Sequence, residues 1–141
     1  MNQTLRSRLV RAFDLTHDLI AHLESDALGA DLPNLPSNRI SGQVWCIVGA
    51  RESYLKAIEA GSWQGFACSL KEPGNKAAVM NALQETRGRL ARIDFGELSG
   101  PQIELAFDLH EHEIQHHGQL IRYVYGNRLS FPDSWHQRYT V

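Results

Sequence analysis

Apolar residues recur every three or four positions over four long stretches of the chain, which is the period of a helix with one buried face. These stretches predict helices at about residues 2–25, 38–60, 76–94 and 101–126. The first stretch shows the period most clearly, in its apolar positions Leu5, Leu9, Phe13, Leu15, Leu19, Ile20 and Leu23. Four amphipathic helices in series predict an all-α protein, built as a four-helix bundle.

Proline and glycine separate the four stretches. Pro33 and Pro36 lie between the first two helices, and residues 96–101 connect the last two. The segment 62–75 carries apolar residues that are expected to pack on the helices: Trp63, Phe66 and Leu70. We expect all three tryptophans in the core: Trp45, Trp63 and Trp135. The tail at 127–141 is expected to be irregular, but its aromatic residues indicate that it docks on the helices.

The composition is that of one globular domain. The chain has 141 residues, of which 43% are hydrophobic and 21% charged, so a single domain over residues 1–141 can bury its own core. A net charge of −2 argues against a nucleic-acid partner. No apolar run is long enough to span a membrane. The first residues do not read as a signal peptide, so we expect a cytoplasmic protein in which Cys46 and Cys68 are reduced.

Four of the seven histidines fall within residues 110–117, and this density predicts a metal site. In a helix, His112 and His116 are i,i+4 neighbours, so both rings can reach one divalent ion. The His-Glu-x-x-His spacing is that of helical zinc sites in metalloproteases, but no downstream Gly-x-x-His completes a metzincin pattern. The chain is also short for such a protease. The simpler alternative is that these histidines are surface or hydrogen-bonded residues.

The predicted fourth helix carries ionisable residues where burial is expected. Its apolar arc is wide, and His110, Glu113 and His117 fall within it. Buried ionisable groups are costly unless they are paired or bind a metal. Either a polar site lies inside the bundle, or part of this arc faces solvent or a partner. The width of the arc predicts a homodimer.

Residues 112–120 resemble the C-terminal signature of the DinB-like superfamily of four-helix-bundle proteins. The chain reads His-Glu-Ile-Gln-His-His-Gly-Gln-Leu there, against roughly His-Glu-x-x-His-Arg-Gly-Gln-Leu in the family. Gly126, Pro132 and Trp135 resemble the end of the family's last helix and its tail, and residues 44–55 resemble its second helix. The resemblance covers essentially the whole chain.

This resemblance implies a bundle with up-down-down-up connectivity that is often a homodimer. Many members hold a divalent metal with three histidines, one from the second helix and two from the fourth, and the fourth-helix pair falls on His112 and His116. Members with assigned activity include thiol-cofactor-dependent S-transferases and isomerases. The implied function is a metal-dependent thiol S-transferase or hydrolase that acts on a small molecule.

By the resemblance, the family's second-helix histidine falls at about Cys46, and this chain has no histidine between His22 and His110. A Cys46 thiolate can bind zinc or nickel beside His112 and His116, and these are the metals we predict. Alternatively, Cys46 is a small buried core residue. In that case the protein is a non-catalytic dimeric bundle, for binding or stress response, whose metal site has degenerated.

Three further residues are candidates for the site. His117 replaces the family's arginine and can substitute for a ligand, orient one or simply pack. Glu113 is a candidate general base, with a helix ion pair or a dimer contact as the alternative. His17 on the first helix can supply a ligand from a neighbouring helix.

Overall fold

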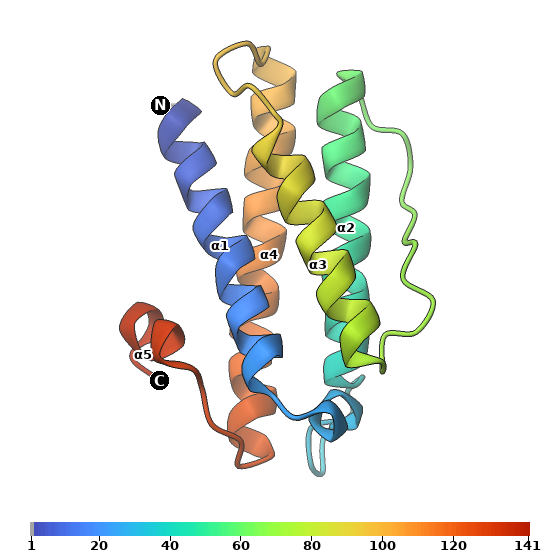
Figure 1. Ribbon diagram of the computed structural model, residues 1–141, viewed down its shortest axis with the longest axis vertical. Coiled ribbons are helices and arrows are strands. Elements are labelled where there is room, and N and C mark those ends of the chain that lie inside the picture. The colour runs from blue at the N-terminus through green and yellow to red at the C-terminus, as the bar shows by residue number, and fades with distance from the viewer. Residues whose placement is uncertain (1) are drawn as a thin grey trace.

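The computed structural model describes residues 2–141, and this part of the chain is all-helical, as predicted. The four long helices lie side by side, with α1 and α4 running in one direction and α2 and α3 in the other (Figure 1). A 3-10 helix, η1, and a short helix, α5, complete the fold. The bounds are α1 Asn2–His22, η1 Ser25–Gly29, α2 Ile40–Ala60, α3 Lys76–Ala91, α4 Gly100–Gly126 and α5 Asp133–Tyr139.

The helix ends follow local capping chemistry. Gly61 ends α2 in the left-handed region, at φ 82°, where glycine carries no Cβ penalty. Ser99 and Gln102 form a capping box at the start of α4, just before and after Pro101. The helix predicted at 76–94 stops at Ala91, and the chain then turns where Gly96 N–H donates to the Asp94 carboxylate.

The sequence predicted an irregular tail, and this prediction is wrong. Part of the tail forms the helix α5. Pro132 precedes the helix and Asp133 opens it, which favours helix initiation because an acidic residue suits the N-terminus. Trp135 is fully buried, and its indole N–H donates to the Leu15 carbonyl at 2.7 Å. The predicted docking of the tail on the helices is therefore confirmed, and the docked segment is a short helix.

A polar layer divides the hydrophobic core into two clusters. One cluster combines the second half of α1, Leu23 just after its end, and the first half of α2, and the other combines the first half of α1 and the end of α2. Each long helix contributes at least one buried polar residue near the boundary between the two clusters: Thr16 from α1, Arg51 and Ser53 from α2, Thr86 from α3, and Glu113, His116 and His117 from α4. Of the residues that the sequence placed in the apolar arc of α4, Glu113 and His117 thus belong to this buried layer, and His110 is half-buried.

The loop at residues 61–75, here called the α2–α3 loop, runs back along α2 because α2 and α3 point the same way (Figure 1). Ser53 Oγ donates to the Ala67 carbonyl and accepts from its N–H. Gly49 provides room for the loop, since a Cβ there would lie 2.4 Å from the Phe66 ring. The loop is therefore seated on α2 by specific contacts.

Two tryptophans lie at the surface, contrary to the prediction of a core position. Trp45 is 39% exposed and packs on the Phe66 ring, and Trp63 is 48% exposed and packs on Tyr54. Both aromatic pairs join α2 to the α2–α3 loop. The tryptophan rings therefore pack on the contact between helix and loop and stay partly exposed to solvent. In the part of the chain that the structure describes, no helix is long and apolar enough to cross a membrane.

Candidate metal centre

Three of the residues singled out in the sequence come together between α2 and α4. Cys46, His112 and His116 each offer a ligand atom, and these three atoms all lie within 4.8 Å of one another. Cys46 Sγ is 3.6 Å from His112 Nε2, and the two imidazole rings are 4.6 Å apart between centroids. His116 is buried, while Cys46 and His112 are half-buried and therefore partly exposed to solvent.

The ring nitrogens of His116 have distinct roles. Its Nδ1 lies 2.5 Å from the Gln43 side-chain oxygen, an acceptor, so Nδ1 carries the proton and donates. This bond fixes the neutral tautomer and leaves Nε2 with a free lone pair. Metal-binding histidines in proteins are usually oriented in this way by an acceptor behind the ring.

His112 has unused hydrogen-bonding capacity. Its Nδ1 is buried without a hydrogen-bond partner, and its Nε2 contacts only the Cys46 thiol. In a tetrahedral zinc site, bond lengths near 2.3 Å to sulfur and 2.0–2.1 Å to nitrogen put the two ligand atoms about 3.6 Å apart. The observed Sγ–Nε2 separation matches this value. The donor set and its spacing therefore fit zinc or another thiolate- and imidazole-binding metal.

Burial keeps both histidines neutral. Desolvation and the neighbouring His112 lower the pKa of His116 to about 4, and desolvation also lowers that of His112. Neutral imidazole is the form that binds a metal. Burial acts in the opposite sense on the thiol and raises the pKa of Cys46. Cys46 is therefore protonated at neutral pH until a cation displaces its proton.

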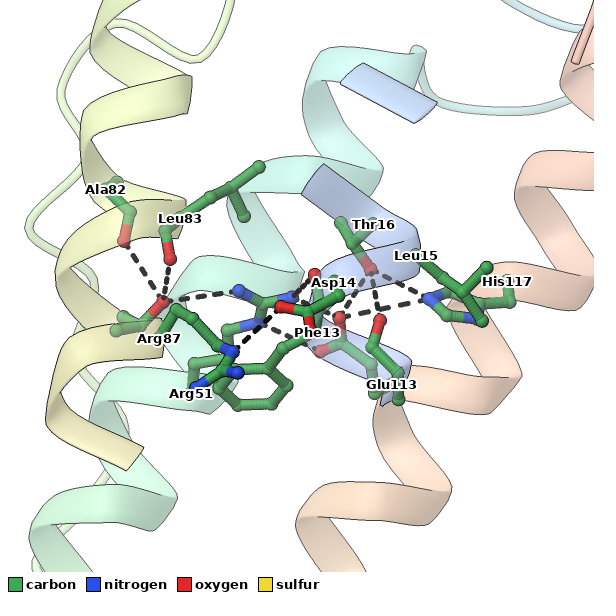
Figure 2. Close-up of polar contacts among 12 residues, drawn as sticks. Phe13, Asp14, Leu15, Thr16, Arg51, Ala82, Leu83, Arg87, Glu113 and His117 are labelled. Atoms are coloured by element: carbon green, nitrogen blue, oxygen red, sulfur yellow. Dashed lines mark hydrogen bonds and ion pairs between the residues drawn. The ribbon is translucent and has the colours of Figure 1, made fainter. Parts of the chain in front are cut away.

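A buried ion pair lies next to the cluster. Arg51 on α2 donates to both carboxylate oxygens of Glu113 on α4, at 3.1 and 2.5 Å, and both side chains are fully buried (Figure 2). Arg51 also donates to Thr86 and to the Phe13 carbonyl, and its guanidinium lies over the Phe13 ring. This pair joins the two helices that carry Cys46 and His112.

The carboxylate of Glu113 is ionised. Burial alone would raise its pKa, but Arg51, through its charge and hydrogen bonds, holds that pKa below its ordinary value, with smaller help from His117 and Thr16. None of the surface of Glu113 reaches solvent. The geometry favours the ion-pair alternative for Glu113 over a general base.

His117 points away from the cluster, toward α1 and α5. Its Nε2 lies 2.7 Å from Thr16 Oγ1 and its Nδ1 lies 2.6 Å from the Tyr139 hydroxyl. One proton order satisfies every group: Tyr139 donates to Nδ1, Nε2–H donates to Thr16, and Thr16 donates to Glu113 at 2.5 Å. Both nitrogens of the neutral His117 ring are therefore used in a hydrogen-bond chain that ends at the Glu113 carboxylate. Figure 2 shows its Thr16 side.

The other histidines also lie outside the cluster. His17 is at the surface of α1 beside Asp18, and His22 contacts Ser130 in the tail. Neither residue is among the three that share the site. Two residues that the sequence did not single out prove important, namely Gln43 behind His116 and Arg51 beside Glu113. Only Arg51 gave a signal, as the charged residue that directly follows the uncharged, mostly apolar run at residues 44–50.

The buried histidines predict a pH dependence of folding for the metal-free protein. Burial lowers the pKa of His117, like that of His116, to about 4, whereas an unfolded histidine titrates near 6.5. Between these values the unfolded chain binds protons that the folded chain does not, so the free energy of unfolding falls as the pH drops from about 6.5 to 4. Urea denaturation at pH 7 and pH 5 measures this. Replacing His117 by glutamine should flatten the dependence, and equal slopes for both proteins would contradict the prediction.

A separate pocket lies elsewhere on the molecule. It has a volume of about 590 Å³ and is bounded by α2, α3 and the α2–α3 loop. None of Cys46, His112 and His116 lines it.

No protein-family model matches the chain, and no curated protein matches it either.

Proposed function

We propose that this chain is a single-domain four-helix bundle of the DinB-like superfamily, with up-down-down-up connectivity. The opposite directions of the α1, α4 pair and the α2, α3 pair support this connectivity (Figure 1). The signature at residues 112–120 supports the family.

We propose further that Cys46, His112 and His116 hold one divalent zinc or nickel ion. The observation that carries this is the convergence of one sulfur and two imidazole donors from α2 and α4 within 4.8 Å. Softer nitrogen and sulfur ligands suit both metals. Three protein ligands leave a coordination position for another molecule.

A metal bound there would lower the pKa of a thiol or water ligand and so supply a nucleophile at neutral pH. This chemistry suits a thiol S-transferase or a hydrolase that acts on a small molecule. The chain contributes by orienting the ligands: Gln43 holds the His116 ring, and the Arg51–Glu113 pair fixes α2 against α4. Because Glu113 is enclosed by its partners, we assign it this positioning role and propose no general base.

Metal analysis of protein purified without a histidine tag tests the proposal. After removal of metal and incubation with excess zinc or nickel, followed by desalting, we expect one ion per chain. Retention of no divalent metal at saturating concentration would remove the main support for the enzyme. A chain with Cys68 replaced by serine is the matched control, because Cys68 lies outside the cluster and should leave uptake unchanged.

A second candidate is a non-catalytic bundle with a degenerate metal site. It is favoured by the raised pKa of Cys46, which makes the thiol a weaker ligand at neutral pH than the family's histidine. It is also favoured by the lining of the 590 Å³ pocket, which includes none of the three candidate ligands. Cobalt-loaded protein distinguishes the two. An added small thiol should change the visible spectrum if a coordination position is open, and should leave it unchanged if the site is closed.

In either case we propose a homodimer. Apolar residues on the outer part of α4 are only partly buried within one chain: Ile103, Leu105, Phe107 and Ile121. Covering them with a second copy would remove apolar surface from water. Light scattering that finds only a 15.9 kDa species at micromolar concentration contradicts this proposal.

A further inference from the structure

The pocket between α2, α3 and the α2–α3 loop is separate from the candidate metal centre in its lining residues. Its volume of about 590 Å³ lies within the range of ordinary small-molecule sites, roughly 300–1,000 Å³. One wall is the Phe66 ring, which is 49% exposed, together with Ala67. Another part of the lining comes from α3, with Glu85 and Arg89, and from Arg92 at its C-terminal end.

The charged side chains of the pocket are mixed in sign. The cations are Lys56, Arg89 and Arg92, and the anions are Glu52 and Glu85. Arg89 is neutralised by Glu59 outside the pocket, which leaves two cations and two anions. The two remaining cations suit a ligand with a single negative charge, whereas Glu52 and Glu85 oppose a dianion such as a phosphate monoester.

Some of these charges are already satisfied within the chain. Arg89 makes two hydrogen bonds of 2.7 Å to Glu59 outside the pocket, and the Glu52 carboxylate accepts two from Ser69. Lys56 and Arg92 have no ion-pair partner within 4.0 Å among residues 2–141, so they remain free to bind a ligand. Lys56 comes from α2, and Arg92 is the residue that caps α3.

The pocket is a built feature rather than a gap beneath a loose loop. The hydrogen bonds of Ser53 with Ala67 and of Glu52 with Ser69 hold the loop on both sides of Cys68. Gly49 lets the Phe66 ring approach α2. The loop therefore presents its aromatic ring to the pocket in a defined position, which reduces the ordering that binding would require.

We propose that this pocket binds a small monocarboxylate with an apolar, ring-sized body. Lys56 and Arg92 contact the carboxylate, since charge-assisted hydrogen bonds are the strongest that these side chains make. The apolar body packs on the Phe66 ring. The site serves a substrate or an effector, and it does not depend on metal binding at Cys46, His112 and His116.

Benzoate is a suitable probe, and benzamide is its neutral counterpart of nearly the same shape. In NMR titrations of the full-length chain we expect saturable shifts with benzoate at residues 52–56, 64–67 and 84–92. Benzamide should bind at least about tenfold more weakly, because it lacks the charge that Lys56 and Arg92 recognise. Inorganic phosphate should also bind more weakly than benzoate.

Lys56→Gln and Arg92→Gln should each weaken benzoate binding about tenfold, the loss expected for one charge-assisted contact. Arg122→Gln, at an exposed position of α4 outside the pocket, is the matched control and should leave binding unchanged. Equal binding of benzamide, tighter binding of phosphate, unchanged binding by both pocket variants, or absence of saturable shifts would each overturn the assignment.

Discussion

Replacing Glu113 by alanine is expected to lower the free energy of unfolding by about 3–5 kcal/mol. The variant leaves the Arg51 guanidinium fully buried and without its counter-charge, and a desolvated unpaired charge is among the most costly defects in a protein interior. A domain of this size has a total stability of roughly 5–15 kcal/mol, so the variant should be measured by urea denaturation at low temperature.

The surface pair of Glu59 and Arg89 provides the matched control. A guanidinium nitrogen of Arg89 lies 2.7 Å from a carboxylate oxygen of Glu59, which is comparable to the buried pair. However, the side chains of Glu59 and Arg89 are 46% and 29% exposed. Glu59→Ala should therefore cost no more than about 1 kcal/mol. If Glu113→Ala costs as little as Glu59→Ala, the interior pair is effectively solvated and the polar layer does not hold the helices as we describe.

A double replacement separates the charge effect from general loss of packing. Arg51→Met with Glu113→Leu removes both charges and keeps similar volumes, so its cost should be well below the sum of the two single losses. The neighbouring hydroxyls retain acceptors, because Thr16 also lies near the Ala12 carbonyl and Thr86 near those of Ala82 and Leu83. A cost equal to the sum would show that the two residues act independently.

The sequence predicted the helical fold because periodicity is a local property. The buried positions of α1 follow the three-and-four spacing throughout, and capping residues such as Ser99 mark where α4 begins. The α5 helix escaped detection because seven residues are too few to show a period. Its stability comes from Trp135, whose burial against α1 is a tertiary contact.

The candidate site was predictable only in part. Spacing alone placed His112 and His116 on one face, and the family resemblance directed attention to Cys46 on another helix. Neither could reveal that Glu113 pairs with Arg51, because the partner lies 62 residues away on α2. The same holds for Gln43 behind His116, whose polar side chain resembles that of any exposed glutamine in a helix.

The ligand set itself can be dissected with cobalt. His116→Ala should abolish stoichiometric binding, because it removes the ring that Gln43 holds in its neutral, metal-binding form. Cys46→Ser should weaken cobalt binding strongly. Loss of a group that only hydrogen-bonds a metal ligand already costs roughly 10- to 100-fold in affinity, and loss of a ligand should cost at least as much. Cys46→Ser should also remove the near-ultraviolet band that a thiolate ligand gives to cobalt.

The matched controls lie outside the cluster. Cys68→Ser keeps Cys46 and should retain the thiolate band, and His17→Ala removes a surface histidine of α1 and should leave the affinity unchanged. The cobalt affinity of Gln43→Ala should lie between that of the control variants and that of the ligand variants. This substitution frees the His116 ring without removing it. Should Cys46→Ser bind cobalt as well as the unaltered chain, the third ligand is another group. His117 would then have to give up its bonds to Thr16 and Tyr139, which the stability of that variant would report.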